Sequence, residues 1–424
     1  MTEDYLYYIW KYKMFDNNSL KTSTGESLEI LNFGIHNHDS GPDFSQGKLK
    51  IGNTIWAGNI EIHINSSDWL KHNHQVDKAY DSVILHVVFN HDKEINLTNG
   101  SLLPVLELKD KLDYTKFEDY QQFIFNSIPC VNQLNDVPNV VISSSLDSML
   151  VERLKQKTEL IKQQLTESNY NWNQVFFQQL AKSIGLKVNA IGMEEMSKKT
   201  SVLLFDKLGD NQLAIESILF GQAGFLENER EGEEYYNTLK KEYEFHKIKN
   251  NLVPITKETW KFSKMRPSNF PTLRLAQLAQ LINTKTTLFD LFIYKEVSIE
   301  KIRKDLKCSI ANGFWYTHYT FETESKPRNK SIGNILIDSI IINTITPFLY
   351  IYGVYKDERV YIEKAIELLE ELPPEDNKIT RLFENKIEMK NAANSQGLIH
   401  CYKELCINKK CLDCSVGIYL LKNN

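Results

Sequence analysis

The sequence predicts an α+β protein: a mixed β-sheet domain with few helices over residues 1–130, then a mainly α-helical domain over residues 140–424 that ends in a four-cysteine motif. A length of 424 residues is enough for two hydrophobic cores. Strand-like patterns bounded by turn residues are confined to residues 31–108. Helical spacing of apolar residues begins only after a polar connection at 132–139. The two patterns therefore indicate two regions of different structure.

The composition is that of a folded protein without a strong overall charge. Hydrophobic residues make up 42% of the chain and charged residues 25%, which leaves little room for extended disorder. The net charge of -5 provides no global field that would hold a polyanion. DNA and RNA are the candidate partners, and binding of either would therefore require a local basic groove.

Neither the N-terminus nor the most apolar stretch suggests export or a membrane. The N-terminus has acidic residues where a secretion signal needs basic ones, and Lys11 and Lys13 interrupt its aromatic run. The longest apolar stretch, residues 335–354, contains Asp338 and Pro347. A buried core helix with a proline bend explains this stretch better than a membrane span. We therefore expect a cytoplasmic protein without a membrane partner.

The first strands form a hairpin. Residues 48–56 alternate polar and apolar side chains around a Gly-Asn turn pair at 52–53. Residues 59–64 alternate again, which places Glu61 and His63 on one face and three isoleucines on the other. The polar pair therefore faces away from the core that the isoleucines enter.

The remaining strands and the helices follow from the same periodicities. Residues 82–89 are apolar nearly throughout, as in a central strand covered on both sides, and residues 103–108 form a further strand after a turn at 99–100. Amphipathic spacing predicts helices over residues 145–165, 172–184, 200–221, 235–249, 273–282 and 359–372.

Histidines and acidic residues are concentrated in the sheet region between residues 36 and 91. The histidines are His36, His38, His63, His72, His74, His86 and His91, and the acids are Asp39, Asp43, Glu61, Asp68, Asp77 and Asp81. Imidazoles and carboxylates that converge supply a metal site or an acid/base site. The alternative is that exposed turns collect such residues without a function.

Three of these residues form a pattern with a chemical meaning. Asp43 stands in a Gly-Pro-Asp-Phe turn before the hairpin, and Glu61 and His63 share one face of the following strand. They can meet at a sheet edge. A divalent ion, magnesium or manganese, could be held by Asp43, Glu61 and the carbonyl group of Ile62, where it would activate a water and neutralise phosphate charge.

This arrangement resembles the active site of the PD-(D/E)XK nuclease superfamily, in which an Asp on one strand and an acid-x-Lys motif on the next surround the metal. His63 replaces the lysine here, and it could act as a base or a third ligand. His72, His74 and His86 are expected as further polar lining of a substrate site. His72 and His74 are two residues apart and do not share a helical face, so they could project from a loop toward the sheet. His86 could equally be a hydrogen-bonded core histidine.

The spacing Cys401-x4-Cys406-x4-Cys411-x2-Cys414 is the strongest single motif in the chain. Four thiolates over so short a span fit one tetrahedral zinc ion or a [4Fe–4S] cluster. The absence of an export signal favours a metal over disulfides. The alternative is four reduced structural cysteines. A metal here would fix the last expected helix, over residues 396–405, onto the helical domain.

Arg266 and Arg274 flank a predicted helix start. An Asn-Phe-Pro sequence at 269–271 supplies a cap and an N-terminal proline. Backbone N–H groups at a helix N-terminus, together with two guanidinium groups, would suit a phosphate. The alternative is an ordinary helix whose arginines pair with carboxylates.

Several longer segments, in order along the chain, are similar to the bacterial domain-of-unknown-function family 2851. They lie at residues 41–44, 56–63, 67–69 with His72 and His74, 80–88 and 266–271, and in the terminal cysteines. The resemblance covers nearly the whole chain. It implies a bacterial cytosolic protein of a family found mainly in Bacteroidetes, and it implies no activity.

The residues themselves favour a metal-dependent nuclease or phosphodiesterase. Asp43 and Glu61 would be metal ligands, and His63 a ligand or base. Arg266 and Arg274 would contact phosphate. A second hypothesis is a non-catalytic, metal-stabilised protein that binds nucleic acid or another protein. A third is a metallohydrolase of small substrates with a histidine-rich zinc centre.

Overall fold

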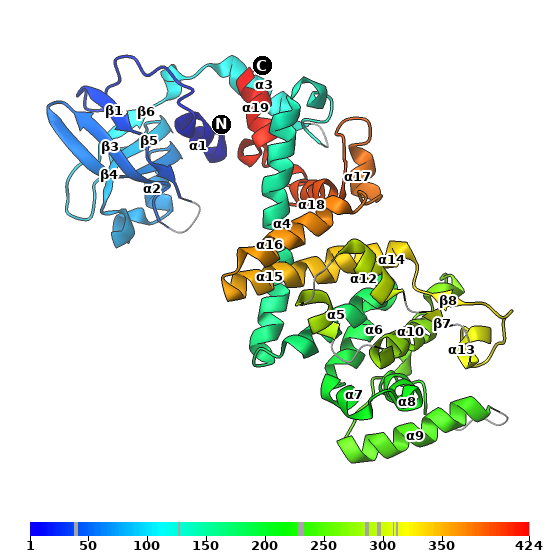
Figure 1. The fold of residues 1–424 in the computed structure, drawn as a ribbon. Coiled ribbons are helices and arrows are strands. Elements are labelled where there is room, and N and C mark those ends of the chain that lie inside the picture. The colour runs from blue at the N-terminus through cyan, green and yellow to red at the C-terminus, as the bar shows by residue number, and fades with distance from the viewer. Residues whose placement is uncertain are drawn as a thin grey trace. The chain divides into compact units, whose positions relative to one another are not determined.

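The structure is a computed structural model that describes residues 1–37, 41–125, 128–227, 233–284, 288–294, 298–307, 309–310 and 313–423. His38 and Asp39 of the histidine-rich segment, and Cys308, lie outside the described residues. The chain forms two compact units. The sheet unit comprises Met1–Ile142 and Tyr402–Asn424, and the helical unit comprises Ser143–Cys401. The predicted α+β class is confirmed (Figure 1).

A mixed sheet forms the centre of the sheet unit. Its strands are β1 (Leu28–Asn32), β2 (Ile35–His36), β3 (Phe44–Ile51), β4 (Thr54–Asn65), β5 (Val83–Asn90) and β6 (Val105–Glu107). Their order is β1-β3-β4-β5-β6, and β2 pairs with β3. The pairs β1/β3 and β3/β4 are antiparallel, whereas β4/β5 and β5/β6 are parallel. The parallel pairing brings β5 beside β4 although residues 66–82 separate them in sequence.

The predicted hairpin and central strand are both present. β3 and β4 meet at the pair Ile51 and Thr54, and Gly52 makes the turn with a positive φ of 56°. In the parallel pair, Glu61 lies opposite His86. Side chains alternate across a strand, so Glu61, His63 and His86 share one face of the sheet.

Each face of the sheet has its own apolar cover. On one face, Ile60, Ile62, Leu85 and Val87 pack in a core with helix α1 (Glu3–Lys11). On the other face, a smaller cluster covers the polar side chains of β4 and β5. It consists of Trp69, Tyr80, Val83, Ile95 and Leu103. The polar face is therefore buried as well, and the exposure of Glu61, His63 and His86 is at most 3%.

The segment between β4 and β5 and the end of the chain complete this unit. Helix α2 (Asp68–Lys71) and two 3₁₀ turns, His74–Val76 and Lys78–Tyr80, cross over the polar face, and α3 (Tyr114–Phe125) follows the sheet. The C-terminal helix α19 (Ser415–Asn423) packs on the core of the sheet unit through Ile418 and Leu421. The structure differs here from the sequence prediction, which assigned residues 402–424 to the helical domain. The reason is that Ile418 and Leu421, on the apolar side of α19, contact the core of the sheet unit.

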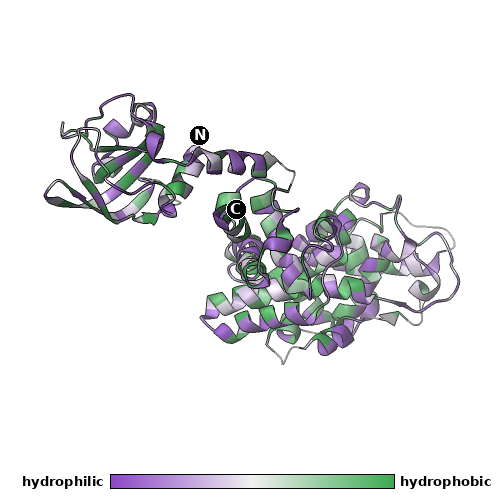
Figure 2. Ribbon diagram, turned by 90° about the horizontal axis from the view of Figure 1, so that it is seen from above, coloured by the Kyte–Doolittle hydropathy of each residue, from purple (hydrophilic) through white to green (hydrophobic). Residues whose placement is uncertain are grey.

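The helical unit contains most of the predicted amphipathic helices. Its helices are α4 (Asn139–Glu167, which begins in the sheet unit), α5 (Trp172–Ile184), α6 (Leu186–Lys198), α7 (Val202–Leu208), α8 (Gln212–Gln222), α9 (Glu234–Asn250), α10 (Pro271–Thr284), α11 (Leu288–Ile293), α12 (Ile299–Leu306), α13 (Phe314–Thr317), α14 (Asn334–Ile340), α15 (Thr346–Lys356), α16 (Arg359–Glu371), α17 (Lys378–Leu382) and α18 (Ala392–Cys401). A small sheet joins β7 (Ser309–Ile310) and β8 (Lys330–Ser331). Most of these helices carry both polar and apolar stretches (Figure 2).

Two details correct the sequence prediction. The helix expected over residues 200–221 is two helices, α7 and α8, because Gly209 adopts a positive φ of 61° between them. The apolar stretch near Pro347 forms α14, a π-helical turn at Ile341–Ile345, and α15. By length and composition it could cross a membrane, but 78% of its most apolar window is buried inside the structure, as in the expected core helix.

Candidate metal centre in the sheet unit

Two carboxylates lie together where β3 begins. Asp43 immediately precedes β3, and its backbone N–H group donates a hydrogen bond to Glu61 Oε2 at 3.1 Å. The backbone N–H group of Ile62 donates in return to Asp43 Oδ2 at 2.8 Å. The hydroxyl group of Tyr7 in α1 also donates a hydrogen bond to Asp43. The backbone N–H groups of Asp43 and Ile62 thus hold both acids in fixed positions.

The environment opposes ionisation of this pair. Burial raises the pKa of Asp43 above its usual range. Burial also raises the pKa of the Glu61 carboxyl group, and the neighbouring Asp43 raises it further. Glu61 is buried and Asp43 is half-buried, and a nearby cation stabilises the ionised form of carboxyl groups whose pKa is raised in this way. The pair therefore has the electrostatic character of a cation site or of a proton-transfer site.

Beside the carboxylates, three histidines are linked by short contacts. His63 Nδ1 lies 2.9 Å from His86 Nε2, across the parallel strand pair β4/β5. His63 Nε2 lies 3.0 Å from Nδ1 of His72. One ring nitrogen of His63 therefore contacts the sheet neighbour, and the other points toward the crossover segment.

The crossover segment adds His74 and completes the cluster. His63, His72 and His74 each offer a ligand atom, and these atoms all lie within 4.8 Å of one another. Glu61 Oε1 is 3.3 Å from Nε2 of His74 and 3.7 Å from Nε2 of His63. Three imidazole nitrogens with one carboxylate oxygen are a donor set that suits zinc or a similar transition metal, whereas magnesium prefers oxygen ligands alone.

The local backbone explains how two histidines so close in sequence can converge. His72 follows the last residue of α2, and His74 begins the next 3₁₀ turn. Between them, Asn73 has a left-handed conformation with φ of 63°, which an asparagine adopts more readily than most residues. The ring centroids of His72 and His74 are 5.5 Å apart. The expectation that both project from a loop toward the sheet is confirmed.

Burial favours the neutral form of three of the histidines, His63, His74 and His86. Burial lowers the pKa of His63 to about 3, and burial lowers the pKa of His74 to about 4. The pKa of His86 is also far below its usual value because of burial. Metal binding requires the neutral imidazole, so these rings are ready for a cation at neutral pH. Among the described residues, the buried Nε2 atom of His74 has no hydrogen-bond partner, and Glu61 Oε1 lies 3.3 Å from it, as expected for two atoms that would face a metal ion.

Aromatic side chains pack against the rings of His74 and His86. The ring of His74 stacks on Tyr80 with centroids 3.7 Å apart, and the ring of Trp69 packs against His74 and His86 at 5.3 Å from each. Trp69 is fully buried. These contacts fix the ring planes of the histidines and exclude water from one side of the cluster. His72, in contrast, is exposed and leaves an open side.

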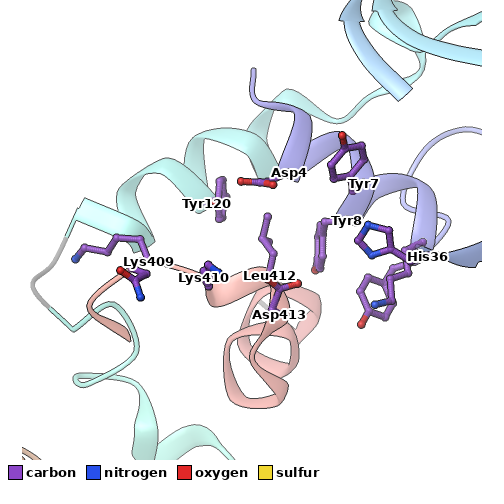
Figure 3. Close-up of a pocket in the computed structure, with 12 residues that line it drawn as sticks. Asp4, Tyr7, Tyr8, His36, Tyr120, Lys409, Lys410, Leu412 and Asp413 are labelled. Carbon is purple, nitrogen blue, oxygen red and sulfur yellow. The ribbon is translucent and has the colours of Figure 1, made fainter. Parts of the chain in front are cut away.

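A pocket of about 330 Å³ in the same unit shares Tyr7 with this site. Figure 3 shows that α1 contributes Asp4, Tyr7 and Tyr8 to the pocket. The C-terminal segment faces them with Lys409, Lys410, Leu412 and Asp413 (Figure 3). Tyr7 thus connects the pocket to Asp43, whose oxygen its hydroxyl group contacts. Sequence reasoning missed Tyr7, since a tyrosine in an amphipathic helix carries no functional signal of its own.

The structure brings six of the predicted residues together and leaves others apart. Asp43, Glu61, His63, His72, His74 and His86 form one site. Asp68 instead accepts hydrogen bonds from the N–H group of Asn65 at 2.9 Å and from Lys71. Asp77 accepts one from the N–H group of Ala79, and Asp81 accepts one from the Thr98 hydroxyl group. These three acids stabilise turns.

Arg266 and Arg274 belong to the helical unit, at the start of α10. Arg266 is exposed, and Arg274 is 6% exposed. Arg274 donates hydrogen bonds to Gln277 Oε1 and Asn269 Oδ1, both at 2.8 Å. Neither arginine is in the sheet unit that carries the histidine cluster.

The cysteines are divided between the units, and a fifth one is involved. Cys401 ends α18 in the helical unit, whereas Cys406, Cys411 and Cys414 are buried in the sheet unit. Cys130 lies in the sheet unit too. Burial, and after it the neighbouring thiols of Cys414 and Cys406, raise the pKa of Cys411 to about 12. Burial also raises the pKa of Cys130, and the three thiols of the C-terminal segment add to that rise.

Four thiols of one unit are therefore close enough to influence one another's ionisation. Sequence spacing could not identify Cys130 as one of them, because it stands more than 270 residues before the others. The raised pKa values of Cys130 and Cys411 favour the protonated thiols, and a bound metal reverses that preference. The donor set fits zinc or an iron–sulfur cluster.

A family model described as "Protein of unknown function (DUF2851)" matches residues 3–378. The matched range includes the sheet site and both arginines, and it ends before the terminal cysteines. No curated protein and no solved structure matches the chain.

Proposed function

The chain belongs to the DUF2851 family, and from the geometry of its sheet site we propose that it is a metal-dependent hydrolase of phosphodiester bonds. The observation that carries the proposal is the convergence of three ring nitrogens within 4.8 Å of one another, next to Glu61 Oε1. Zinc or manganese fits this donor set better than magnesium, the other ion expected from the sequence.

In this proposal the histidines divide into ligands and a supporting residue. His63, His72 and His74 hold the ion. His86 contacts Nδ1 of His63 at 2.9 Å, which leaves Nε2 of His63 directed to the ligand cluster. A partner on the second ring nitrogen commonly fixes the tautomer and the ring orientation of a metal-bound histidine. When bound, the ion lowers the pKa of a water and neutralises phosphate charge.

The carboxylates supply proton transfer and position. Burial and Asp43 raise the pKa of Glu61, so it would be ionised only beside a bound cation. In that form it would act as a general base that takes a proton from a water and returns it to the leaving oxygen. Asp43 fixes Glu61 through its backbone N–H group at 3.1 Å. The tyrosine hydroxyl group of Tyr7 in turn orients Asp43.

The resemblance of Asp43 and Glu61-x-His63 to the nuclease pattern supports phosphodiesters of DNA or RNA as the substrate class. Burial supports a second candidate, hydrolysis of a small substrate at the same centre. His63 is 2% exposed and His74 is 9% exposed, so the cluster opens to solvent mainly at His72. A small phosphodiester reaches such a site more easily than a duplex does.

The test uses the full chain loaded with zinc or with manganese. It is incubated with single-stranded DNA, duplex DNA, RNA and a chromogenic phosphodiester. We expect metal-dependent hydrolysis that Glu61→Gln abolishes and that His91→Gln, a histidine outside the cluster, leaves unchanged. Hydrolysis of the chromogenic compound alone would favour the small-substrate candidate. Stoichiometric metal without hydrolysis would favour the non-catalytic hypothesis, and no metal at the histidines would exclude the centre.

For the cysteines we propose a structural metal site in the sheet unit. Cys406, Cys411 and Cys414 are three of its ligands. The fourth is Cys130, which is in the same unit, or Cys401, which the sequence spacing suggests. Zinc or a [4Fe–4S] cluster would fix the C-terminal segment to α3 and the sheet.

A further inference from the structure

We propose that a pocket at the start of α10 in the helical unit binds a phosphate group. The pocket has a volume of about 650 Å³ and lies between the N-terminal end of α10, β8 and α14. All its lining residues belong to the helical unit. The inference is therefore independent of the proposed hydrolase site.

The charge of the pocket is one-sided. Four cationic side chains line it: Arg266, Arg274, Arg328 and Lys330. Among the described residues that line the pocket there is no aspartate and no glutamate. A concave surface lined by cations and by no carboxylate concentrates anions, because no negative charge offsets its positive field.

Arg274 is the clearest sign that an anion is needed. It is 6% exposed, and its side chain donates to the neutral amide oxygens of Gln277 and Asn269, each at 2.8 Å. Among the described residues, no carboxylate pairs with Arg274 and its buried Nε atom has no hydrogen-bond partner. A buried charge without a counter-charge is costly. An anion in the pocket supplies that counter-charge and accepts hydrogen bonds from the remaining N–H groups of Arg274.

Lys330 adds a second buried charge to the same wall. It is 5% exposed, and its ammonium group donates to the carbonyl oxygens of Trp315 at 2.8 Å and His318 at 2.7 Å. It also lies 3.9 Å above the ring of Tyr319, which lines the pocket. Its donors are satisfied by neutral groups, so Lys330 contributes positive potential rather than direct hydrogen bonds.

The remaining groups favour phosphate over other anions. α10 has 14 residues, and the positive end of its dipole lies at the pocket, where Ser268 and Asn269 are part of the lining. Arg266 and Arg328 are exposed and free to close over a ligand. One guanidinium group can donate two parallel hydrogen bonds to two oxygens of the same phosphate group.

The size of the pocket indicates that the phosphate is part of a larger molecule. A volume of about 650 Å³ is in the range of small-molecule sites and exceeds the space that inorganic phosphate fills. Leu273, Leu336 and Tyr319 provide an apolar and aromatic wall for the rest of the ligand. A nucleotide and a nucleic-acid strand both present this chemistry.

The experiment measures binding by calorimetry to the full chain carrying Glu61→Gln, a substitution that prevents hydrolysis and leaves the metal of the cysteine site in place. The probes are inorganic phosphate, a nucleoside monophosphate and a short single-stranded oligonucleotide. We expect at least one probe to bind, and the double variant Arg266→Gln, Arg328→Gln to bind it at least about tenfold more weakly. Arg359→Gln, an exposed arginine of α16 in the same unit, is the matched control and should bind as the wild type does.

Arg274→Met gives a second readout that a purely structural arginine would not produce. It should retain the melting temperature measured without ligand, because it removes an unpaired buried charge, and it should lose the rise in melting temperature caused by the bound probe. Binding of the monophosphate alone identifies a small ligand, and binding of the oligonucleotide alone identifies a nucleic acid. The inference is overturned if no probe binds, or if the double variant binds as tightly as Arg359→Gln.

Discussion

Asp43 and Glu61 each accept a hydrogen bond from the backbone beside the other: the N–H group of Asp43 donates to Glu61 Oε2, and the N–H group of Ile62 donates to Asp43 Oδ2. This exchange holds two carboxylates side by side although burial raises the pKa of both. It also separates two possible roles of the pair, because an amide side chain can keep these hydrogen bonds but cannot transfer a proton or carry the charge.

Asp43→Asn and Glu61→Gln should therefore keep the fold and lose activity. Each retains an oxygen that accepts the backbone hydrogen bond, while the loss of a general base or of a ligand charge should lower the rate of metal-dependent hydrolysis by about 10²- to 10⁴-fold. Initial rates and melting temperatures measure the two effects. Asp43→Ala, which removes the acceptor, should lower both. Full activity of Glu61→Gln would remove Glu61 from the chemistry.

His86→Gln should weaken metal binding without removing a ligand. His86 contacts Nδ1 of His63 at 2.9 Å, so its loss frees the orientation of a ligand ring. Removing a residue that contacts the second ring nitrogen of a metal-bound histidine commonly lowers the metal affinity by roughly 10- to 100-fold. Competition with a chromogenic zinc chelator measures the affinity. His91→Gln serves as the control, and an unchanged affinity in His86→Gln would show that His86 has no part in the centre.

Cys411→Ser should release the metal of the cysteine site and lower the melting temperature, because structural metal binding contributes directly to folding free energy. The C-terminal segment should then become sensitive to protease. Visible absorbance of anaerobically purified protein distinguishes iron–sulfur from zinc.

Cys130→Ser and Cys401→Ser, compared with each other, identify the fourth ligand. We expect Cys130→Ser to lose the metal, since Cys130 and the other three thiols share one unit. Metal analysis and thiol titration of the folded protein provide the readout. The site would be contradicted altogether if anaerobically purified wild-type protein contained neither metal and Cys406, Cys411 and Cys414 reacted readily while the protein was folded.

Glu216 should make the helical unit less stable as the pH rises. It is buried in α8, where the hydroxyl group of Tyr235 and the amide of Gln212 donate to it, and burial raises its pKa. A carboxyl group whose pKa is raised by folding contributes stability below its unfolded pKa, and that stability is lost as the pH rises through the folded pKa.

The test compares Glu216→Gln, which cannot ionise, with the wild type. The variant's melting temperature relative to the wild type should be higher at about pH 7 than at about pH 4. Glu363→Gln, an exposed glutamate of α16, is the control. A difference that does not change with pH would mean that Glu216 does not titrate as described.

The sequence by itself determined the local pattern of this protein. The alternation of Ile60, Glu61, Ile62 and His63 fixes which side chains share a face of β4, because side chains alternate along any strand. The Gly-Asn turn set the hairpin, and the helical periodicity after residue 139 set the second region. These features depend on neighbours in sequence, so a single chain reveals them.

Only the tertiary structure decided which of these residues meet. His86 lies opposite Glu61 because β4 and β5 pair in parallel, and His74 reaches the cluster because α2 and Asn73 bring the crossover segment over the sheet. In the same way the apolar side of α19 packs on the core of the sheet unit, and the thiols of Cys406, Cys411 and Cys414 in the preceding segment lie near Cys130. Strand pairing and helix docking depend on the free energy gained when segments distant in sequence bury apolar surface against each other. The spacing of residues within one segment does not reveal which distant segment it contacts.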